Sequence, residues 1–259
     1  MRRLLVLDLD GTLIDRRDRI SNEKLEVIEK IKEKYDITLA TGRSYLSAFY
    51  FAKYLDINIP IICFDGSLVC DTKGNDYFSY YIGKIETLEI LNFVKKFKNC
   101  SINVFYKEKT LSNLSMLSLG ISLKHWKINN KIYLNEINSF EIYKIVLASY
   151  NYKVLSQIEM FLKDFRIGYY TYPSAKRKGV YVMDVFNKFV SKGKAIEIIK
   201  KLFRYDFIVS VGDYINDLEM FKVSDVSIAP LKSHRIVRET ANYVISDFSQ
   251  IVEILKNYD

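Results

Sequence analysis

The chain has 259 residues, enough for one large domain or two modest ones with proper hydrophobic cores. Hydrophobic residues make up 49% and charged residues 27%, as in globular proteins, and no apolar run approaches the ~20 residues that cross a bilayer, which excludes a membrane-spanning pump. The net charge of +8 is compatible with nucleic acid or a small anionic substrate, and the spread of lysines along the chain favours a generally basic surface.

The first third of the chain alternates predicted strands and helices. Residues 4–8 form a short apolar run without a helical period that ends in polar residues and a glycine, as buried parallel strands do. Ser21 is placed to cap a helix that carries Leu25, Ile28 and Ile31 on one face. The elements expected next are a strand at 37–41, a helix at 44–55, a strand at 59–64 and a β-hairpin over 68–81 with its turn at 73–75.

From about residue 83 the pattern changes. The predicted order is a helix at 85–97, a strand at 102–106, a stretch of ambiguous periodicity to about 138, a strand at 142–149, a helix at 153–165 and strands at 167–172 and 180–186. Helices and strands that alternate without tight βαβ spacing indicate a separate α+β module.

The first pattern then returns. The expected elements are a helix at 192–203, strands at 207–211, 226–229 and 243–245, a short helix around Met220 and a final helix that runs to the C-terminus. The sequence therefore predicts an α/β fold. A Rossmann-like, doubly wound core with a parallel sheet is expected at 1–82 and 188–259, and an α+β domain is inserted into it at 83–187.

Two acidic clusters follow predicted strands of this core. Asp8 and Asp10 lie in the segment LDLDGTL, and side chains two residues apart in an extended chain can face a common centre. Asp213 and Asp217 lie in VGDYIND, directly after the strand at 207–211. Parallel strands bring both clusters to the same edge of the sheet, where converging carboxylates need a cation such as Mg²⁺. For Asp217, capping of the following helix is an equal alternative.

Two shorter motifs supply groups that suit phosphate. The TGR segment at 41–43 follows a strand, where a hydroxyl and backbone N–H groups can hold a phosphate oxygen. The SKG segment at 191–193 opens a helix, whose dipole and free N–H groups favour an anion, and Lys192 can add a positive charge opposite the metal. Lys188 and Lys194 are alternatives to Lys192 in this role.

Together, the four motifs resemble those of the haloacid dehalogenase superfamily, and the whole chain is similar to phosphatases of its Cof-type branch, which carry a large α+β cap. The motifs occur in the family's order, and the expected insertion falls where that branch carries its cap. The resemblance implies an enzyme, a Mg²⁺-dependent phosphoric monoester hydrolase that forms an aspartyl-phosphate. Its expected partner is a small phosphorylated metabolite of the sugar phosphate or phosphoglycolate class.

The resemblance also implies roles for individual residues. Asp8 attacks phosphorus, and Asp10 protonates the leaving oxygen and then deprotonates the water that cleaves the phospho-aspartate. The residues implied to bind phosphate or substrate are Thr41, Gly42, Arg43, Lys192 and Asn216, the last of which supports either the phosphate or Lys192. The groups implied to bind Mg²⁺ are Asp8, the backbone carbonyl of Asp10, Asp213 and, directly or through water, Asp217.

One position departs from the family's pattern. Asp65 precedes Gly66 where the family usually carries Asn, which leaves open the details of the hairpin and any substrate contact there, but not the core chemistry. We expect the cap segments near 124–131 and 169–178 to select the substrate.

Other functions are weighed against this one. A dehalogenase lacks the second aspartate, so Asp10 argues against that reaction, whereas a phosphomutase shares the motifs and differs through its cap. A basic nucleic-acid-binding protein on an inactive scaffold is a further alternative, because tyrosines at 169–172 precede basic residues at 176–178, as in single-strand binders. Such a scaffold is expected to have lost an essential aspartate, and none is missing, so nucleic acid is the less favoured partner.

The same residues bear on location. Cys63, Cys70 and Cys100 follow no metal-ligand spacing, which favours reduced thiols. The apolar stretch after Met1 stops at Asp8, too soon for a secretory signal. We therefore expect a cytoplasmic protein without a membrane partner.

Overall fold

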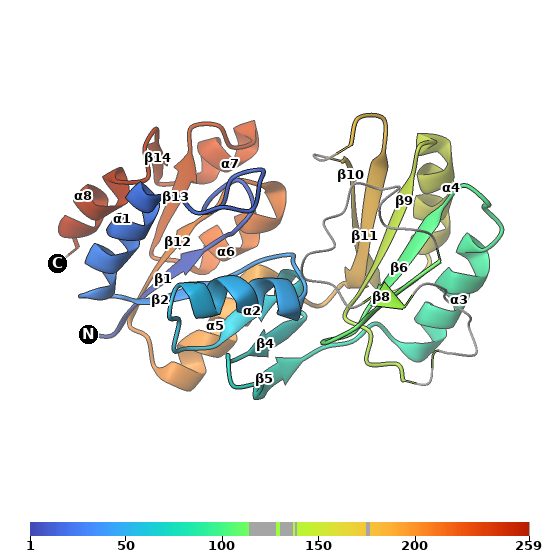
Figure 1. Cartoon of the computed structure of the whole chain (residues 1–259), viewed down its shortest axis with the longest axis horizontal. Coiled ribbons are helices and arrows are strands. Elements are labelled where there is room, and N and C mark those ends of the chain that lie inside the picture. The colour runs from blue at the N-terminus through green and yellow to red at the C-terminus, as the bar shows by residue number, and fades with distance from the viewer. Residues whose placement is uncertain (114–127, 130–136, 138, 175–176, 259) are drawn as a thin grey trace. The chain divides into compact units, whose positions relative to one another are not determined.

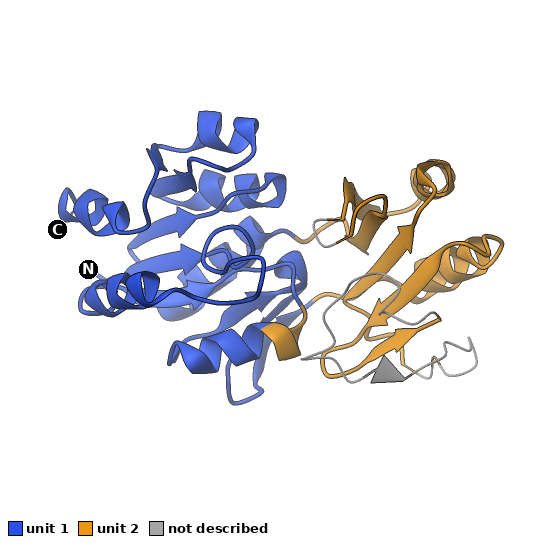
Figure 2. Ribbon diagram, turned by 45° about the horizontal axis from the view of Figure 1, so that its top comes forward, with its two compact units in different colours: residues 1–43, 48–79, 191–259 blue, residues 44–47, 80–190 orange. Residues whose placement is uncertain are grey.

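The computed structural model describes residues 1–113, 128–129, 137, 139–174 and 177–258. The chain separates into two compact units, which Figure 2 shows in different colours. Unit 1 comprises Met1–Arg43, Ala48–Ser79 and Ser191–Asp259, and unit 2 comprises Ser44–Ser47 and Tyr80–Val190. Unit 1 is therefore built from segments that are far apart in the sequence.

Unit 1 contains a five-stranded parallel sheet in the order β14-β13-β12-β1-β2 (Figure 1). β1 (Arg3–Leu7) lies between β2 (Asp36–Leu39) and β12 (Phe207–Val211), and β13 (Val226–Pro230) and β14 (Tyr243–Ile245) continue the sheet. β1 and β12 pair residue for residue along their whole length. Because the two strands are parallel and in register, the residues that follow them emerge at the same edge of the sheet.

Helices cover this sheet and bury their apolar faces against it. α1 begins after Ser21, whose hydroxyl accepts a hydrogen bond from the Lys24 N–H at 3.4 Å, as predicted. Ile196 and Ile199 of α5 pack in one buried cluster with Leu4 and Val6 of β1. The helices of unit 1 are α1 (Asn22–Lys32), α2 (Tyr45–Tyr54), whose first residues belong to unit 2, α5 (Lys192–Phe203), α6 (Leu218–Val223), α7 (Arg235–Thr240) and α8 (Gln250–Lys256).

The predicted strand at 59–64 has a different place from the one expected. Only β3 (Ile61–Cys63) is extended, and it pairs antiparallel with β4 (Leu68–Cys70), which in turn pairs with β5 (Asp76–Ser79) in a separate three-stranded sheet. A single parallel bridge between Ala40 and Ile62 joins this small sheet to the chain after β2. The β4–β5 pair is the hairpin that the sequence predicts.

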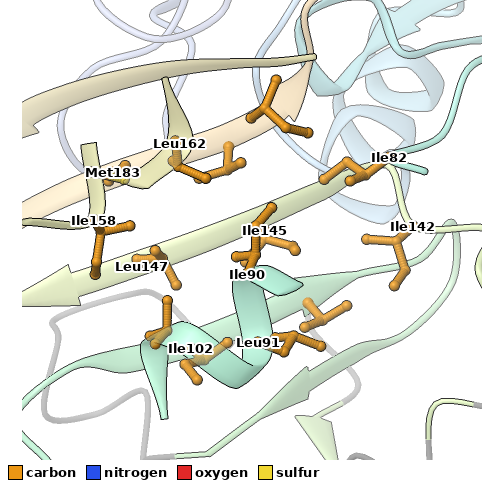
Figure 3. Close-up of a cluster of buried hydrophobic side chains, with 14 of the residues drawn as sticks. Ile82, Ile90, Leu91, Ile102, Ile142, Ile145, Leu147, Ile158, Leu162 and Met183 are labelled. Carbon is orange, nitrogen blue, oxygen red and sulfur yellow. The ribbon is translucent and has the colours of Figure 1, made fainter. Parts of the chain in front are cut away.

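Unit 2 contains a six-stranded mixed sheet in the order β10-β11-β9-β6-β7-β8, with α3 and α4 packed on one face. Alternate residues of the strands face these helices, as Figure 3 shows for Ile102, Ile145, Leu147 and Met183. Each buried aliphatic side chain of this kind contributes about 1.5–3 kcal/mol relative to exposure. The elements are α3 (Lys84–Val94), β6 (Ser101–Phe105), β7 (Thr110–Ser112), β8 (Ile128–Asn129), β9 (Lys144–Ser149), α4 (Tyr152–Leu162), β10 (Ile167–Pro173) and β11 (Tyr181–Asn187).

These elements confirm the predicted α/β fold class, a parallel-sheet core with a separate α+β part. Apart from β8, the segment at 124–131 lies outside the described residues, as do residues 175–176. Among the helices that the structure describes, none combines the length and apolar character needed to cross a bilayer.

Candidate active site

The first acidic motif lies at the carboxyl end of β1. The Asp8 N–H donates to the carbonyl of Val211 at 2.9 Å, so the pairing of β1 with β12 extends to this residue. The Asp8 residue is 5% exposed. The paired backbone and the surrounding core therefore hold its carboxylate in a fixed position.

Lys192, the first residue of α5, joins the two acidic motifs. Its Nζ donates to Oδ1 of Asp8 and to Oδ1 of Asp217, both at 2.6 Å. Lys192 is 1% exposed, whereas Lys188 and Lys194 are exposed. Of the three lysines that the sequence leaves open, Lys192 is the one that reaches the acidic motifs.

Asp217 uses its two carboxylate oxygens differently. Oδ1 accepts from Lys192, and Oδ2 accepts from the backbone N–H groups of Asp213 at 2.8 Å and Tyr214 at 2.9 Å. The side chain is fully buried. Asp217 therefore closes the short η4 turn (Ile215–Asp217) and lies in the acidic cluster. The alternative expected from the sequence, a side-chain cap on the following helix, is not found, because the Asp217 side chain makes no cap hydrogen bond to α6.

Three carboxylates converge beside Lys192. Asp8, Asp213 and Asp217 each offer one oxygen atom, and these atoms lie within 4.8 Å of one another. Gly11 has a φ of +83°, and a Cβ there would lie 2.2 Å from Oδ2 of Asp213, so only glycine fits. A compact set of carboxylate oxygens is the kind of donor set that Mg²⁺ takes in proteins.

The cluster holds more negative than positive charge. Burial alone would lower the pKa of Lys192, but the charges of Asp217 and Asp8 raise it above its ordinary value, so the ammonium group stays protonated. Burial raises the pKa of Asp8 well above its usual range. The positive charge of Lys192 lowers this pKa, and the negative charge of Asp217 raises it further. Burial, followed by the Asp217 charge, raises the pKa of Asp213 to about 6. Both the donor atoms and the excess negative charge thus fit a divalent cation.

The Asp10 carboxylate is bound by Arg43. Nε and Nη2 of Arg43 donate to its two oxygens at 2.7 and 2.6 Å, and Nη2 also donates to Asp18 at 2.5 Å. The chain between Asp8 and Asp10 turns and is not extended, but the charge of Asp10 still acts on both Asp8 and Asp213, so Asp10 lies near the acidic cluster. The chain leaves the strand at Leu9, whose carbonyl accepts two backbone hydrogen bonds from residues 13 and 14. Arg43, expected at the phosphate, is here a partner of carboxylates.

The remaining predicted residues lie around a turn that the motifs did not place in the site. Thr41 is 1% exposed, and its hydroxyl accepts from the Arg43 N–H at 3.1 Å. The Asn216 side-chain amide donates to Oδ1 of Asp65 at 2.8 Å, and the Asp65 charge acts on Lys192. Asp65 is therefore a site residue that motif reasoning missed. Its one signal was the departure from the family's pattern.

Comparison with known proteins gives consistent matches over most of the chain. A family model described as haloacid dehalogenase-like hydrolase matches residues 5–251. A phosphoglycolate phosphatase of Thermoplasma volcanium is 24% identical over 255 residues, which cover 95% of this chain and 92% of that protein. A 5-amino-6-(5-phospho-D-ribitylamino)uracil phosphatase of Bacillus subtilis is 22% identical over 254 residues, covering 93% and 89%.

Solved structures show the same fold. A sugar phosphatase of haloacid dehalogenase subclass IIB matches with a TM-score of 0.79 at 18% identity, over 99% of this chain and 98% of that one. The resemblance predicted from the motifs, to a phosphatase of the haloacid dehalogenase superfamily, is confirmed. The family match spans all four motifs and nearly the whole chain, and the chain therefore belongs to the haloacid dehalogenase-like hydrolase family.

Proposed function

We propose that this protein is a Mg²⁺-dependent phosphatase that hydrolyses small phosphomonoesters through an aspartyl-phosphate on Asp8. The observation that carries the proposal is the clustering of the Asp8, Asp213 and Asp217 carboxylates at one edge of the sheet, with Lys192 bonded to Asp8 and Asp217. Clustered carboxylates can hold a phosphate ester close to a carboxylate nucleophile only when a cation offsets their repulsion.

The metal ligands are proposed to be Asp8, Asp213, Asp217 and the backbone carbonyl of Asp10. A bound Mg²⁺ would neutralise charge on the nucleophile and on the phosphoryl group. The pairing with Lys192 favours the ionised form of Asp8 and leaves a positive charge beside it for a phosphoryl oxygen. The backbone N–H groups of Thr41 and Arg43 donate to the Ile62 carbonyl and the Thr41 hydroxyl, so the groups proposed to complete the anion-binding surface are the Thr41 hydroxyl, as a donor, and the first turn of α5.

The reaction proceeds in two steps at phosphorus. An Asp8 oxygen forms a bond to phosphorus, the bond to the leaving oxygen breaks, and that oxygen takes a proton from Asp10. Water then attacks phosphorus, Asp10 takes a proton from this water, and the Asp8 carboxylate and inorganic phosphate are released. Arg43 holds Asp10 through two hydrogen bonds, so Asp10 must leave this bidentate pair or loosen it before it donates a proton.

Unit 2 is proposed to be the cap of a Cof-type enzyme, with the domain limits at 83–187 expected from the sequence. The phosphoglycolate and phosphoribitylaminouracil phosphatases among the relatives support a small phosphomonoester as the substrate. The sugar phosphatase among the solved structures supports the sugar phosphate class. Substrate selection by 124–131 and 169–178 and a cytoplasmic location stay predictions.

The test is phosphate release from a panel of phosphoglycolate, sugar phosphates and polyol phosphates, in excess Mg²⁺ and in EDTA. We expect release with Mg²⁺, none with EDTA, and none from Asp8→Asn, while Asp76→Asn, an exposed aspartate in β5, behaves as wild type. Full activity in EDTA would contradict the proposal. An isomerised phosphosugar without free phosphate would indicate a mutase. Salt-sensitive oligonucleotide binding without any turnover would indicate the nucleic-acid-binding alternative.

A further inference from the structure

Asp65 occupies a turn that is tied to the phosphate-binding segment. It lies in η1 (Phe64–Gly66) with φ 57° and ψ 26°, in the left-handed region that Asp and Asn tolerate better than most residues. Its N–H donates to the Thr41 carbonyl at 3.0 Å, and the Phe64 N–H donates to the Arg43 carbonyl at 2.9 Å. Two backbone hydrogen bonds therefore fix the turn against the segment at 41–43.

The Asp65 carboxylate borders the groups proposed to bind phosphate. The residue is 5% exposed, and Oδ1 accepts from the Asn216 amide at 2.8 Å. A Cβ on Gly42 would lie 2.9 Å from each carboxylate oxygen, so these oxygens lie directly against the backbone there. The charge of Asp65 also acts on Lys192.

A buried carboxylate in this place has two opposite effects. Its hydrogen bond fixes the orientation of Asn216, which helps any ligand that the amide contacts. Its negative charge repels a phosphate dianion, because like charges in a buried site are weakly screened. An amide in the same position would keep an acceptor for Asn216 and remove the repulsion.

We propose that Asp65 is a positioning residue that also limits phosphate affinity. It holds Asn216 in place, and its charge weakens the binding of inorganic phosphate, so that the product is released. The inference rests on the proposed phosphatase function, because phosphate is the product of that reaction. Asp65 touches no reacting atom in this scheme and acts through Asn216 and through its charge.

The test compares wild type with two neutral variants of the full chain loaded with Mg²⁺. Asp65→Asn keeps an acceptor for Asn216 and suits the left-handed backbone, and Asp65→Gly accepts that backbone without strain but removes the acceptor. The readouts are the inhibition constant of inorganic phosphate, calorimetric phosphate binding, and kcat and KM separately. A purely structural role would leave the phosphate constant of Asp65→Asn unchanged.

We expect phosphate to bind about tenfold more tightly to Asp65→Asn, the size of effect that follows from removing one nearby like charge in a partly screened site. KM should fall with it, and kcat should stay closer to wild type than in Asp65→Gly. If Asp65→Asn does not fold, Asp65→Gly is still expected to bind phosphate more tightly than wild type. Phosphate affinity unchanged or weakened in every folded neutral variant overturns the inference.

Asp71→Asn is the matched control. Asp71 is a buried aspartate whose carboxylate accepts from the backbone N–H groups of Lys73 and Asn75 within its own turn, so its phosphate constant should equal that of wild type. An equal gain in phosphate affinity in Asp71→Asn would mean that the overall charge of the protein, and not Asp65, sets this affinity. A wild-type protein that neither releases nor binds phosphate overturns the proposed function itself. If wild type turns over substrate but Asp65→Asn has the same inhibition constant for phosphate as wild type, only the role of Asp65 is overturned.

Discussion

Replacing Lys192 with Met tests whether this lysine and the metal share the task of neutralising the acidic cluster. The ammonium group bonds Asp8 and Asp217, both at 2.6 Å, in a site where Lys192 is 1% exposed. Lys192 is also the first residue of α5, where the helix dipole disfavours a cation, so its place there is explained by the two carboxylates. Met has a similar length and no charge, so the substitution leaves two buried carboxylates without their partner.

Lys192→Met is expected to lose much of its folding stability when no Mg²⁺ is present. Removing one partner of a buried ion pair costs about 3–5 kcal/mol, because an uncompensated charge remains buried. In a chain of this size the cost corresponds to a fall in Tm of roughly 6–20 °C. Excess Mg²⁺ replaces the missing positive charge, so it should raise the Tm of Lys192→Met more than that of wild type.

Thermal unfolding followed by circular dichroism, in EDTA and in Mg²⁺, measures both effects. Lys194→Met is the matched control, since Lys194 is exposed on the same helix, and its stability should lie within about 0.5 kcal/mol of wild type. Equal Tm values for the two variants in EDTA, or no extra gain from Mg²⁺ in Lys192→Met, would refute the shared neutralisation.

Three further predictions concern the aspartates and Arg43. Asp8→Asn should form no phosphoenzyme that mass spectrometry detects, and near wild-type activity in this variant would disprove the role of Asp8 as nucleophile. Asp10→Asn should slow turnover by about 10²–10⁴-fold. It should accumulate a phospho-aspartate from p-nitrophenyl phosphate, whose leaving group needs little protonation. Arg43→Lys keeps the charge but not the two hydrogen bonds to Asp10, so Asp10 should leave this pair more easily, and kcat should rise by up to about tenfold for alkyl phosphates and less for p-nitrophenyl phosphate; an equal change for both substrates would show that Arg43 does not act through proton transfer. The pKa of Asp213 is raised from 3.8 to about 6 in the folded, metal-free protein, so the stability contributed by its protonated form, about 3 kcal/mol, is present below pH 4 and is lost as the pH rises through 6. Mg²⁺ should therefore raise the Tm more at neutral pH than at about pH 5, and Asp213→Asn should make the two Tm increases more equal.

Local signals predicted the parts of the fold that depend on neighbouring residues. α5 has the bounds expected from its N-terminal Ser191 and its apolar period, and β12 coincides with its apolar run. α7 was not predicted, because Val237 is its only residue that the structure buries, which leaves almost no periodic pattern to read.

The parts of the site that the sequence did not predict depend on contacts between distant residues. The pair of Arg43 with Asp10 depends on the turn at Leu9, which no residue pattern specified. The bond between Asp65 and Asn216 joins residues 151 positions apart. Asp8 and Lys192 could be expected near each other because each directly follows, or begins, a regular element with a clear signal, and the two side chains do form a hydrogen bond.

The central place of β1 in the sheet has a consequence for how the protein is made. β2 is the next strand after β1, with only α1 between them, but the other neighbour, β12 (Phe207–Val211), is synthesised after all of unit 2. Until then one edge of an apolar strand has no partner, and such an edge invites pairing between chains. We expect nascent chains shorter than about 210 residues to fold unit 2 first and to aggregate through β1, which protease mapping of stalled chains would detect. β1, which directly precedes the proposed nucleophile Asp8, then gains its second neighbouring strand late in synthesis. An unfinished chain therefore has no working site.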